Sequence, residues 1–393
     1  MKKVLIANKF YYNRGGDCIA SIALEKLLKS KGHDVAFFSM QYEKNFESEW
    51  SPYFPSEVDF HSPGLAGKLK AFERIFRSGE VERKFSLLLE RFRPDVVHLN
   101  NIHSYLSPVI GEIAHKKGVK VVWSLHDHKL VCPAYLCLRG GHPCTLCVNG
   151  NVSNVLLKKC MKNSLPASLA AFLEALYWNR PRLARNTDHF IVPSRFLADM
   201  MAKGGFPPSQ IKVLPNYVNH DLPAGIAGKG DYYLYVGRLS EEKGVHTLLE
   251  AARSLPCELQ IAGDGPLRGL LSENMPNVKY LGFKSWDELS PIVRKAKFVV
   301  MPSECYENNP LAVIESLCLG TPVLGADIGG IPETIMPEQQ NGMLFKSGDK
   351  MDLQDKIKTM FERSFNYQEI ADEARERFSA DKYYNEIIKI YEQ

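Results

Sequence analysis

Two glutamates, Glu307 and Glu315, are the side chains in this sequence with the clearest capacity for chemistry. The segment that joins them reads Glu-Asn-Asn-Pro-Leu-Ala-Val-Ile-Glu. We predict that Asn309 is a helix N-cap, that Pro310 is the first helical residue and that Gly320 follows the helix end. Such a helix points free N–H groups and its positive dipole end toward a ligand. The two carboxylates could then bind two separated hydroxyl groups, whereas the alternative is a solvated helix cap with one surface glutamate.

Strands and helices that alternate along the chain must position these residues. Apolar runs rich in Val, Leu, Ile and Tyr predict strands at 4–8, 35–39, 96–100, 119–125, 190–193, 212–215, 232–237, 258–262, 278–281, 298–301 and 323–325. Alternation of this kind implies parallel sheets that are covered by helices on both faces. Ligands then bind at the carboxyl ends of the strands.

The chain of 393 residues is too long for one ordinary core, so we expect two doubly wound α/β domains. We place the first at 1–205 and the second at 206–380, with the boundary in a Gly- and Pro-rich segment. A terminal helix at 381–393 could dock on either domain.

Composition excludes several protein classes. Apolar residues make up 45% and charged residues 24% of the chain, which is ordinary globular usage rather than disorder. No apolar run reaches the roughly 18 residues that cross a bilayer, and the apolar N-terminus is interpreted as a first strand. We therefore expect a cytoplasmic protein, with attachment to the inner face of the cell membrane left open.

Charge is distributed unevenly between the two halves. Residues 1–205 have 29 Lys and Arg against 18 Asp and Glu, a net charge of +11, and the remaining residues have a net charge of −7. A basic half suggests an anionic partner such as nucleic acid, anionic lipid or a phosphorylated substrate. No nucleic-acid-binding motif is visible, so we expect no nucleic acid partner.

Five short motifs, in order, resemble those of the family 4 retaining glycosyltransferases. The stretch from Glu307 to Glu315 resembles the E-x7-E motif of that family. The other four are Ser-Leu-His-Asp at 124–127, Gly-Arg-Leu with Glu-Lys-Gly at 237–244, Gly-Asp-Gly-Pro at 263–266 and Gly-Gly-Ile-Pro-Glu at 329–333. The resemblance covers nearly the whole chain. It implies the GT-B fold, in which two Rossmann-like domains face each other across a cleft, the first binding the acceptor and the second the nucleotide-sugar donor.

The resemblance implies catalytic roles for four residues. Arg238 and Lys243 would hold the donor diphosphate, and two fixed cations can neutralise a leaving diphosphate. Glu307 would face the sugar hydroxyls, and His126 would contact the donor sugar. The structural alternatives are a cleft-edge ion pair, a solvated helix start, a surface carboxylate and a strand-end histidine.

Nine further residues are implied to bind the donor. Glu315 would accept hydrogen bonds from the ribose hydroxyls, and glycines would allow close backbone approach to the nucleotide, although they could equally be simple turn residues. The full set is Gly15, Gly16, Gly263, Gly265, Asn308, Asn309, Pro310, Leu311 and Glu315.

The implied reaction is transfer of a hexose-type sugar with retention of anomeric configuration. The resemblance favours UDP as the nucleotide, with GDP second, and a saccharide or lipid-linked saccharide of surface polysaccharide synthesis as the acceptor. The chain has no D-x-D segment in a metal-binding context, so we expect no metal at the active site and no obligatory cofactor. Two alternatives are a nucleotide-sugar 2-epimerase of the same fold and a non-catalytic partner subunit.

Five cysteines between 132 and 160 form a separate cluster. Their order is Cys132-x4-Cys137-x6-Cys144-x2-Cys147, with Cys160 thirteen residues later. Thiols at this density can bind a structural zinc ion, although the spacing is not that of a standard zinc finger. Reduced thiols and disulfides are the alternatives.

A basic segment at 65–93 has eight Lys and Arg, four Asp and Glu, and apolar residues at helical spacing. It is typical of a basic amphipathic helix that contacts an anionic membrane, or of a helix that packs on its own domain with a solvated basic face.

Overall fold

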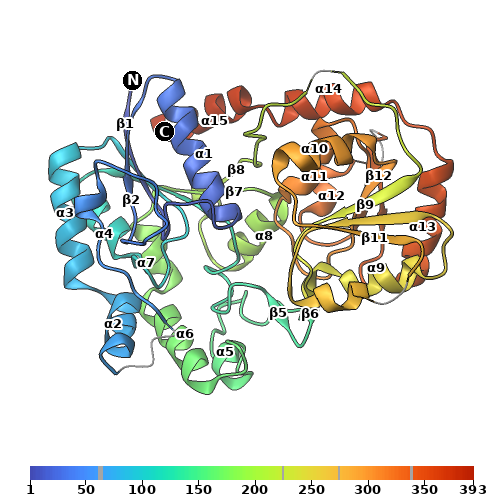
Figure 1. Ribbon diagram of the computed structural model, residues 1–393. Coiled ribbons are helices and arrows are strands. Elements are labelled where there is room, and N and C mark those ends of the chain that lie inside the picture. Colours follow the sequence, from blue (N-terminus) through green and yellow to red (C-terminus); the bar gives the residue numbers. More distant parts are fainter. Residues whose placement is uncertain (61–64, 224, 273–274, 337–339) are drawn as a thin grey trace.

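Buried strands form two six-stranded parallel sheets, one in each half of the chain (Figure 1). The computed structural model describes residues 1–60, 65–223, 225–272, 275–336 and 340–393. Each sheet lies between helices, as the alternation of strands and helices predicted. Most of the strands are buried along nearly their whole length, which explains their continuous apolar runs.

The first sheet has the strand order β2-β1-β3-β4-β7-β8. Its strands are β1 (Lys3–Ala7), β2 (Asp34–Phe38), β3 (Val96–Leu99), β4 (Lys120–Ser124), β7 (His189–Val192) and β8 (Ile211–Val213). The helices of this half are α1 (Gly16–Ser30), α2 (Leu65–Phe76), α3 (Gly79–Phe92), α4 (Val109–Lys116), α5 (Asn154–Leu157), α6 (Leu165–Tyr177), α7 (Arg180–Arg185) and α8 (Arg195–Lys203).

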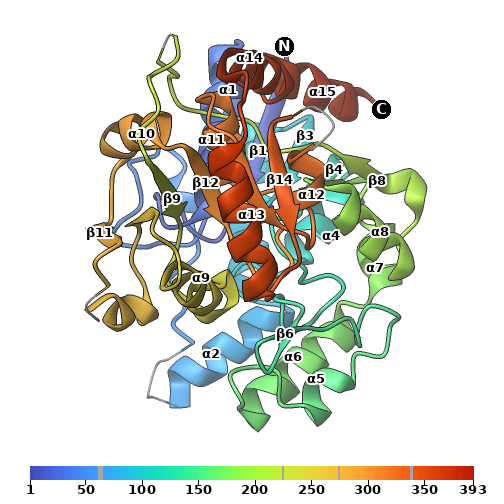
Figure 2. The same cartoon turned by 90° about the vertical axis from the view of Figure 1, so that its right-hand side faces the viewer.

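The second sheet has the strand order β11-β10-β9-β12-β13-β14. Its strands are β9 (Tyr232–Val236), β10 (Glu258–Ala262), β11 (Val278–Gly282), β12 (Phe298–Met301), β13 (Val323–Ala326) and β14 (Gly342–Phe345). The helices are α9 (Val245–Ala252), α10 (Trp286–Lys295), α11 (Leu311–Cys318), α12 (Ile331–Thr334), α13 (Lys350–Glu362), α14 (Tyr367–Arg377) and α15 (Ala380–Glu392). Figure 2 shows α13 lying across β13 and β14.

Strand order reverses once in each sheet. In the first sheet β1 lies between β2 and β3, and in the second β9 lies between β10 and β12. The connections on the two sides of such a point leave in opposite directions, which opens a crevice at the carboxyl ends of the strands. Both domains therefore have a built-in place for a ligand.

The domain boundary lies later than the sequence indicated. Strand β8 pairs with β7, and Leu214 packs in the first core, whereas Val218 packs in the second. The first domain thus continues about nine residues beyond the predicted limit at 205. The Gly- and Pro-rich segment at 204–208 is a turn inside the first domain, between α8 and β8.

The terminal helix, α15, docks on the first domain. Ile387, Ile390 and Tyr391 lie in the first core. The Tyr391 hydroxyl is 2.6 Å from Nδ1 of the buried His98. The chain therefore crosses between the domains twice, and Figure 1 shows both termini on the first lobe.

The basic segment at 65–93 is two helices rather than one. Helix α2 ends at Phe76 and α3 begins at Gly79. Arg74 is fully buried and pairs with Glu80 across the break, at 3.0 Å, while the apolar face of α3 packs in the first core. None of the helices in the described residues has the length and apolar character that a bilayer crossing requires.

Glu333 joins the two domains. Its carboxylate oxygens accept hydrogen bonds from the backbone N–H groups of Arg195 and Phe196, at 2.7 and 2.6 Å. Those groups open α8, where Ser194 also accepts from the N–H of Leu197. A carboxylate from one domain thus caps the positive end of a helix in the other.

Replacement of this carboxylate tests the link. Glu333→Gln should lower the free energy of unfolding by about 1 kcal/mol, because a neutral amide loses the charge that complements the helix end. Denaturant titration measures this loss, with Glu373→Gln on the exposed side of α14 as control. Equal effects of the two variants would show that the cap does not hold the domains together.

Candidate active site

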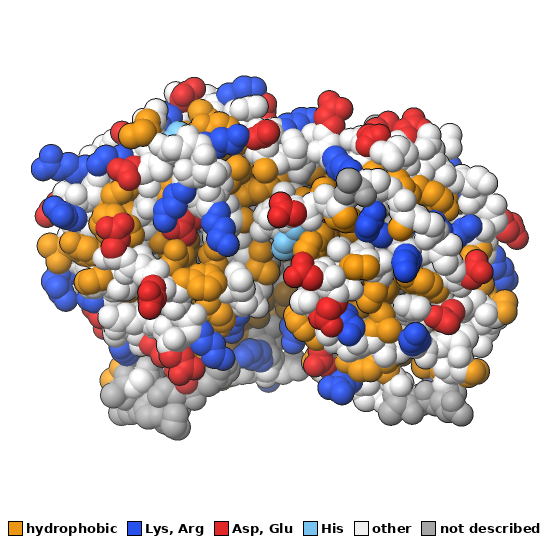
Figure 3. Space-filling view, turned by 45° about the horizontal axis from the view of Figure 1, so that its top comes forward, with side chains coloured by type: hydrophobic (Ala, Val, Ile, Leu, Met, Phe, Trp, Pro, Cys, Tyr) orange, Lys and Arg blue, Asp and Glu red, His pale blue; other side chains and the backbone are white. Residues whose placement is uncertain are grey.

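A cleft of about 520 Å³ lies between the two domains. It is visible in Figure 3 as a recess between the lobes. Its walls come from the strand-order reversals of both sheets, since Asp17 and Asn100 follow β1 and β3, and Arg238 and Glu307 follow β9 and β12. The cleft therefore lies where the topology requires a crevice.

Lys243 and Glu307 form an ion pair on the second-domain wall. Lys243 Nζ lies 2.5 Å from Glu307 Oε1, and the buried Ser303 hydroxyl donates to the same oxygen at 2.8 Å. Burial opposes the Lys243 charge, but the neighbouring Glu307 carboxylate outweighs it and the pKa of Lys243 is raised. The lysine is therefore a fixed cation on the cleft wall.

Glycines allow the loops of this wall to approach one another. A Cβ on Gly244, which has φ +69°, would lie 1.8 Å from the Pro302 carbonyl oxygen. A Cβ on Gly330 would lie 1.8 Å from the Asn308 carbonyl oxygen. No side chain fits at either distance, so these glycines hold the loops after β9, β12 and β13 together.

Arg238 lies at the cleft edge with an exposed side chain. The Tyr235 hydroxyl donates to its backbone carbonyl at 2.7 Å and fixes the loop. Gly263 and Gly265 lie behind this loop, because a Cβ at either would meet the carbonyl of Gly237 or Leu239 at 1.9 and 2.4 Å. These two glycines are not among the residues that line the cleft, and their observed contacts are with the Arg238 loop.

Helix α11 begins one residue later than predicted. Its N-cap is Pro310, not Asn309, and the first helical residue is Leu311. The Asn309 side chain is used elsewhere, because its Oδ1 accepts from the Asn216 N–H at 2.8 Å and its Nδ2 donates to Thr334 Oγ1 at 3.0 Å. The remaining predictions hold, since Gly320 follows the helix end with φ +73° and the helix N-terminus lines the cleft.

Glu315 lies one turn into α11 and is largely but not fully buried, with 17% of its side chain exposed. Burial raises the pKa of its carboxyl to about 7. His220 Nε2 lies 3.7 Å from Glu315 Oε1, but burial lowers the pKa of His220, so this neighbour is largely neutral at pH 7. The His220 ring stacks on Trp286 with centroids 4.4 Å apart. A carboxylate beside a flat aromatic pair suits a ribose and a base.

His126 stands on the first-domain wall at the carboxyl end of β4. Its Nε2 lies 2.9 Å from Asn100 Oδ1. Burial lowers the pKa of His126, the Asp17 carboxylate opposes that shift, and Lys9 adds to it. Asp17 is held by Lys9 at 3.1 Å and by Asn101 at 3.0 Å. His126 is therefore a neutral imidazole in a polar network that spans the β1 and β3 loops.

Asn308 connects the two walls. Its Nδ2 donates to the His126 carbonyl oxygen at 3.3 Å. Asn308 Oδ1 and Asn100 Nδ2 are buried and have no hydrogen-bond partner among the described residues. Buried polar atoms are rarely left unpaired, so these two are available to water or to polar groups of a ligand.

Some of the remaining predicted residues line the cleft, and others lie outside its lining. Gly16, Asn309, Pro310 and Leu311 line the cleft together with the catalytic candidates. Gly15, the N-cap of α1, and Glu315, one turn into α11, are not part of the lining. Asp127, the residue after His126, closes a turn, because its carboxylate accepts a hydrogen bond from the Lys129 N–H at 2.8 Å.

Sequence reasoning missed the polar residues that support this site. Asn100 and Ser303 come one and two residues after buried strands. The rule that ligands bind at the carboxyl ends of parallel strands would have found them. Nothing in the pattern signals His220 and Trp286, because they meet only when α10 folds against the loop before β9.

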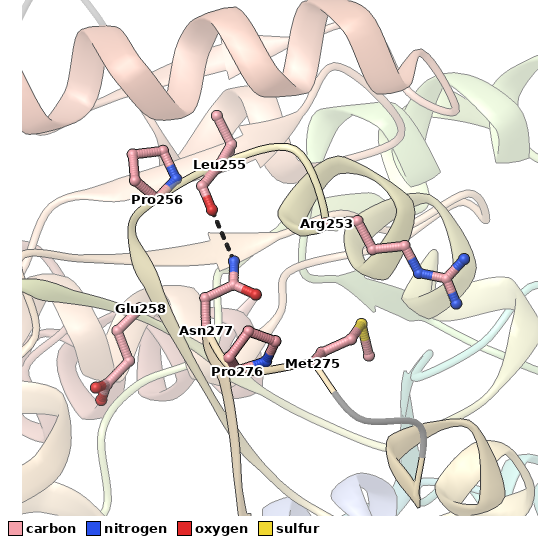
Figure 4. A pocket seen from close by; sticks show the side chains of 7 residues that line it. All are labelled: Arg253, Leu255, Pro256, Glu258, Met275, Pro276 and Asn277. Carbon is pink, nitrogen blue, oxygen red and sulfur yellow. Dashed lines mark hydrogen bonds between the residues drawn. The ribbon is translucent and has the colours of Figure 1, made fainter.

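A second hollow, of about 770 Å³, lies at the amino ends of β10 and β11 (Figure 4). Arg253 and Glu258 lie on opposite sides of it, and Asn277 at its centre donates to the Leu255 carbonyl. Its polar groups do not converge on one point. The smaller interdomain cleft, with charged groups that converge from both walls, is the better candidate.

Comparison with known proteins agrees with this geometry. The family model "Glycosyltransferase Family 4" matches residues 22–222, just over half of the chain, and "Glycosyl transferases group 1" matches residues 221–379. The chain belongs to glycosyltransferase family 4. The two matches together span both domains and meet at 221–222, close to the observed crossing between them.

Relatives of this family 4 glycosyltransferase extend over its full length. An uncharacterized glycosyltransferase of Methanocaldococcus jannaschii is 23% identical over 401 residues, covering 100% of this chain and 98% of the relative. Sucrose-phosphate synthase from Thermosynechococcus elongatus has a TM-score of 0.69 at 18% identity, covering 100% of this chain and 99% of that one. Anabaena HepE in complex with UDP-glucose has a TM-score of 0.63 at 19% identity, covering 99% of each chain. The fold is GT-B, as the motifs implied.

Removal of the Lys243 charge tests the second-domain wall. Lys243→Ala should lower kcat by about 10²–10³, the usual cost of deleting one preorganised group that stabilises developing charge. Steady-state kinetics measures it. Lys358→Ala, in an exposed ion pair on α13, is the matched control and should retain full activity. An unchanged kcat in Lys243→Ala would contradict the assignment.

The pKa of Glu315 predicts opposite effects of pH on binding and stability. Only the ionised carboxylate could accept hydrogen bonds from both hydroxyls of a ribose, so the donor KM should rise about tenfold as pH falls from 8 to 6 through the value of about 7. Stability moves the other way, because a carboxyl with a raised folded pKa stabilises at low pH and loses this as pH rises.

Glu315→Gln separates these effects from other titrations. It should raise the donor KM and flatten its dependence on pH between 6 and 8. Kinetics at saturating acceptor measures this. A pH profile in the variant that still follows the wild type would assign the titration to another group.

Proposed function

We propose that the protein is a retaining glycosyltransferase that moves a hexose-type sugar from a nucleotide diphosphate sugar to a hydroxyl group of a saccharide or lipid-linked saccharide. One observation carries the proposal. Two cations, the Glu307 carboxylate and a helix N-terminus on one wall face a neutral histidine and an unpaired amide on the other, within a single cleft, and Glu315 lies one turn further along the same helix. This set matches a ligand with a charged diphosphate between two groups rich in hydroxyls.

Each part of the donor has a partner of fitting chemistry. Arg238, Lys243 and the N-terminus of α11 suit the diphosphate. Glu315 suits the ribose, with His220 and Trp286 beside it for the base. Glu307 suits sugar hydroxyls, together with the unpaired Asn308 Oδ1. UDP is the favoured nucleotide, because the structural relative HepE has been solved with UDP-glucose.

Transfer then needs no protein nucleophile. The acceptor oxygen bonds to C1 on the face that the diphosphate leaves, while the C1–O bond to the diphosphate breaks. The acceptor proton passes to the leaving diphosphate oxygen. Arg238 and Lys243 stabilise the negative charge on that diphosphate, and neutral His126 donates or accepts a hydrogen bond at the sugar without adding charge. Two fixed cations would neutralise the leaving diphosphate, as a bound metal ion does in other transferases. We therefore expect activity without added Mg²⁺.

The acceptor side is supported by the first domain, which is basic overall. Helices α2 and α6 pack side by side below that domain in both ribbon views (Figures 1 and 2). Leu69 and Phe72 on α2, and Leu165 and Leu169 on α6, are between 42% and 62% exposed. An apolar strip on a basic domain fits peripheral contact with an anionic membrane that presents a lipid-linked acceptor.

A donor screen tests the proposal. Nucleotide release from UDP- and GDP-hexoses should rise severalfold when a saccharide or polyprenyl-linked saccharide acceptor is added, with or without Mg²⁺. NMR of the product should show the anomeric configuration of the donor. Glu307→Gln, in which the sugar-facing carboxylate is lost, should reduce transfer at least tenfold.

The same screen tests the alternatives. A 2-epimerase would release an epimerised sugar and nucleotide without any acceptor. A non-catalytic partner subunit would bind nucleotide, as seen by thermal shift, but turn over no donor. Inversion at the anomeric carbon would overturn the proposed mechanism while leaving the family assignment intact.

A further inference from the structure

Four cysteines surround one small cavity in the segment between β4 and α6. The cavity has a volume of about 20 Å³ and is lined by Cys132, Cys144, Cys147 and Cys160 among others. The cysteines come from three separate loops within 125–164. A space of this size holds a single water or ion and is far too small for an iron–sulfur cube. All four are free thiols in the structure.

We propose that Cys132, Cys144, Cys147 and Cys160 bind one zinc ion as a tetrahedral thiolate site. Tetrahedral sites with four sulfur ligands are typical of structural zinc. Binding replaces four S–H bonds by four Zn–S bonds and releases four protons, which leaves a net charge of −2 on the site. This proposal does not depend on the proposed function.

The charges around the cavity complement such a site. Arg139 and Lys158 belong to its lining, and no Asp or Glu does among the described residues. Two cations beside a site of charge −2 leave the local charge near zero. For four neutral thiols the same cations would have no counter-charge in the cavity.

The backbone around the cavity has little regular structure to hold it in place. Regular structure in residues 125–164 is confined to the two-residue strands β5 (Leu138–Arg139) and β6 (His142–Pro143) and to the single-turn helix α5. Tyr135, Cys137 and Lys159 are non-glycine residues with φ between +48° and +57°. Such residues cost about 1 kcal/mol or more each and persist only when surrounding contacts fix them. The separate apolar cluster here is small, and its buried members among the described residues are Ala134, Val155 and Ala171.

Arg180 holds two of the cysteine loops in place. Its guanidinium donates to the carbonyls of Val131 and Cys147, at 3.0 and 2.7 Å, and to that of Val148. Cys132 and Cys147 are thus fixed on the two sides of the cavity. A preformed frame of this kind lowers the entropy that metal binding must overcome.

The four thiols must move closer to one another before they can bind a metal ion. No three Cys, His, Asp or Glu side chains within the described ranges already form a metal-binding group. Zinc–sulfur bonds are about 2.3 Å long, so the four side chains must rotate toward the cavity centre. Cys137 is fully buried and outside the cavity lining, and its thiol hydrogen-bonds to that of Cys132, so we assign it to the support of this ligand rather than to the zinc ion.

The site would stiffen the wall of the active-site cleft. The Cys132 N–H donates to the His128 carbonyl at 2.7 Å, two residues after His126. The His128 ring lies 6.2 Å from that of Tyr306, the residue before Glu307. A zinc ion at Cys132 would therefore support the contact between the histidine loop and the donor loop.

Metal analysis of the full chain, purified with reductant and without chelator, tests the proposal. We expect one zinc per chain by mass spectrometry, and loss of at least four-fifths of it in the double variant Cys144→Ser, Cys147→Ser. Cys257→Ser, outside the cluster, should retain the full zinc content. Cys137→Ser should also retain it, which separates the proposed ligands from the fifth cysteine.

Cobalt binding keeps the test independent of how the variants fold. Wild-type protein reconstituted with Co²⁺ should show the absorption bands of tetrahedral cobalt with thiolate charge transfer. Four reactive thiols without zinc, or Cys-Cys disulfides in peptide mapping, would overturn the proposal. Iron in place of zinc would keep the tetrathiolate site but overturn the choice of metal.

Discussion

The reversal of strand order in each sheet is the constraint on which the rest of this structure depends. Parallel strands place all their carboxyl ends on one edge, and only where the winding changes direction do neighbouring loops part and leave a crevice. The loops after β1 and β3 part in the first domain, and those after β9 and β12 part in the second. The cleft forms because these two edges face each other, and many of its charged and polar lining residues come from those loops.

Charged side chains in the cleft are partly removed from water, which costs free energy, and neighbouring residues reduce that cost. The Lys243 and Glu307 pair is partly withdrawn from water, where a lone charge would be strongly unfavourable. Glycine at positions 244 and 330 lets the backbones approach closely enough for the pair to form. Glu315 has no such cation, and its carboxyl is held with a raised pKa instead. Residues kept in environments that weaken stability are commonly those that bind or react.

The fold and most of the cleft could be predicted from the sequence, because both depend on local patterns. The apolar runs placed all eleven predicted strands within two residues of their observed positions, and the residues that the motifs singled out, His126, Arg238, Lys243 and Glu307, lie in one cleft. Strand β14, which is short and begins with a glycine, was not predicted.

The predictions that were wrong concern features that depend on contacts between segments distant in sequence. The domain boundary was misplaced because β8 belongs to the first sheet only through its pairing with β7. Asn309 was predicted to cap α11, but Asn216 and Thr334 compete for its side chain. The segment 65–93 was read as one helix, whereas the buried Arg74–Glu80 pair stabilises a break. The roles of Gly263 and Gly265 required the position of a loop that lies far away in sequence.

The central claim is that the cleft holds a nucleoside diphosphate through fixed cations on the second-domain wall. Calorimetric titration of UDP and UMP, and of GDP and GMP, into wild type and Lys243→Ala tests it most directly. The account predicts that the wild type binds one of the diphosphates at least tenfold more tightly than its monophosphate, and that Lys243→Ala loses most of this preference. Equal affinity for diphosphate and monophosphate in the wild type, or an unchanged preference in the variant, would contradict it.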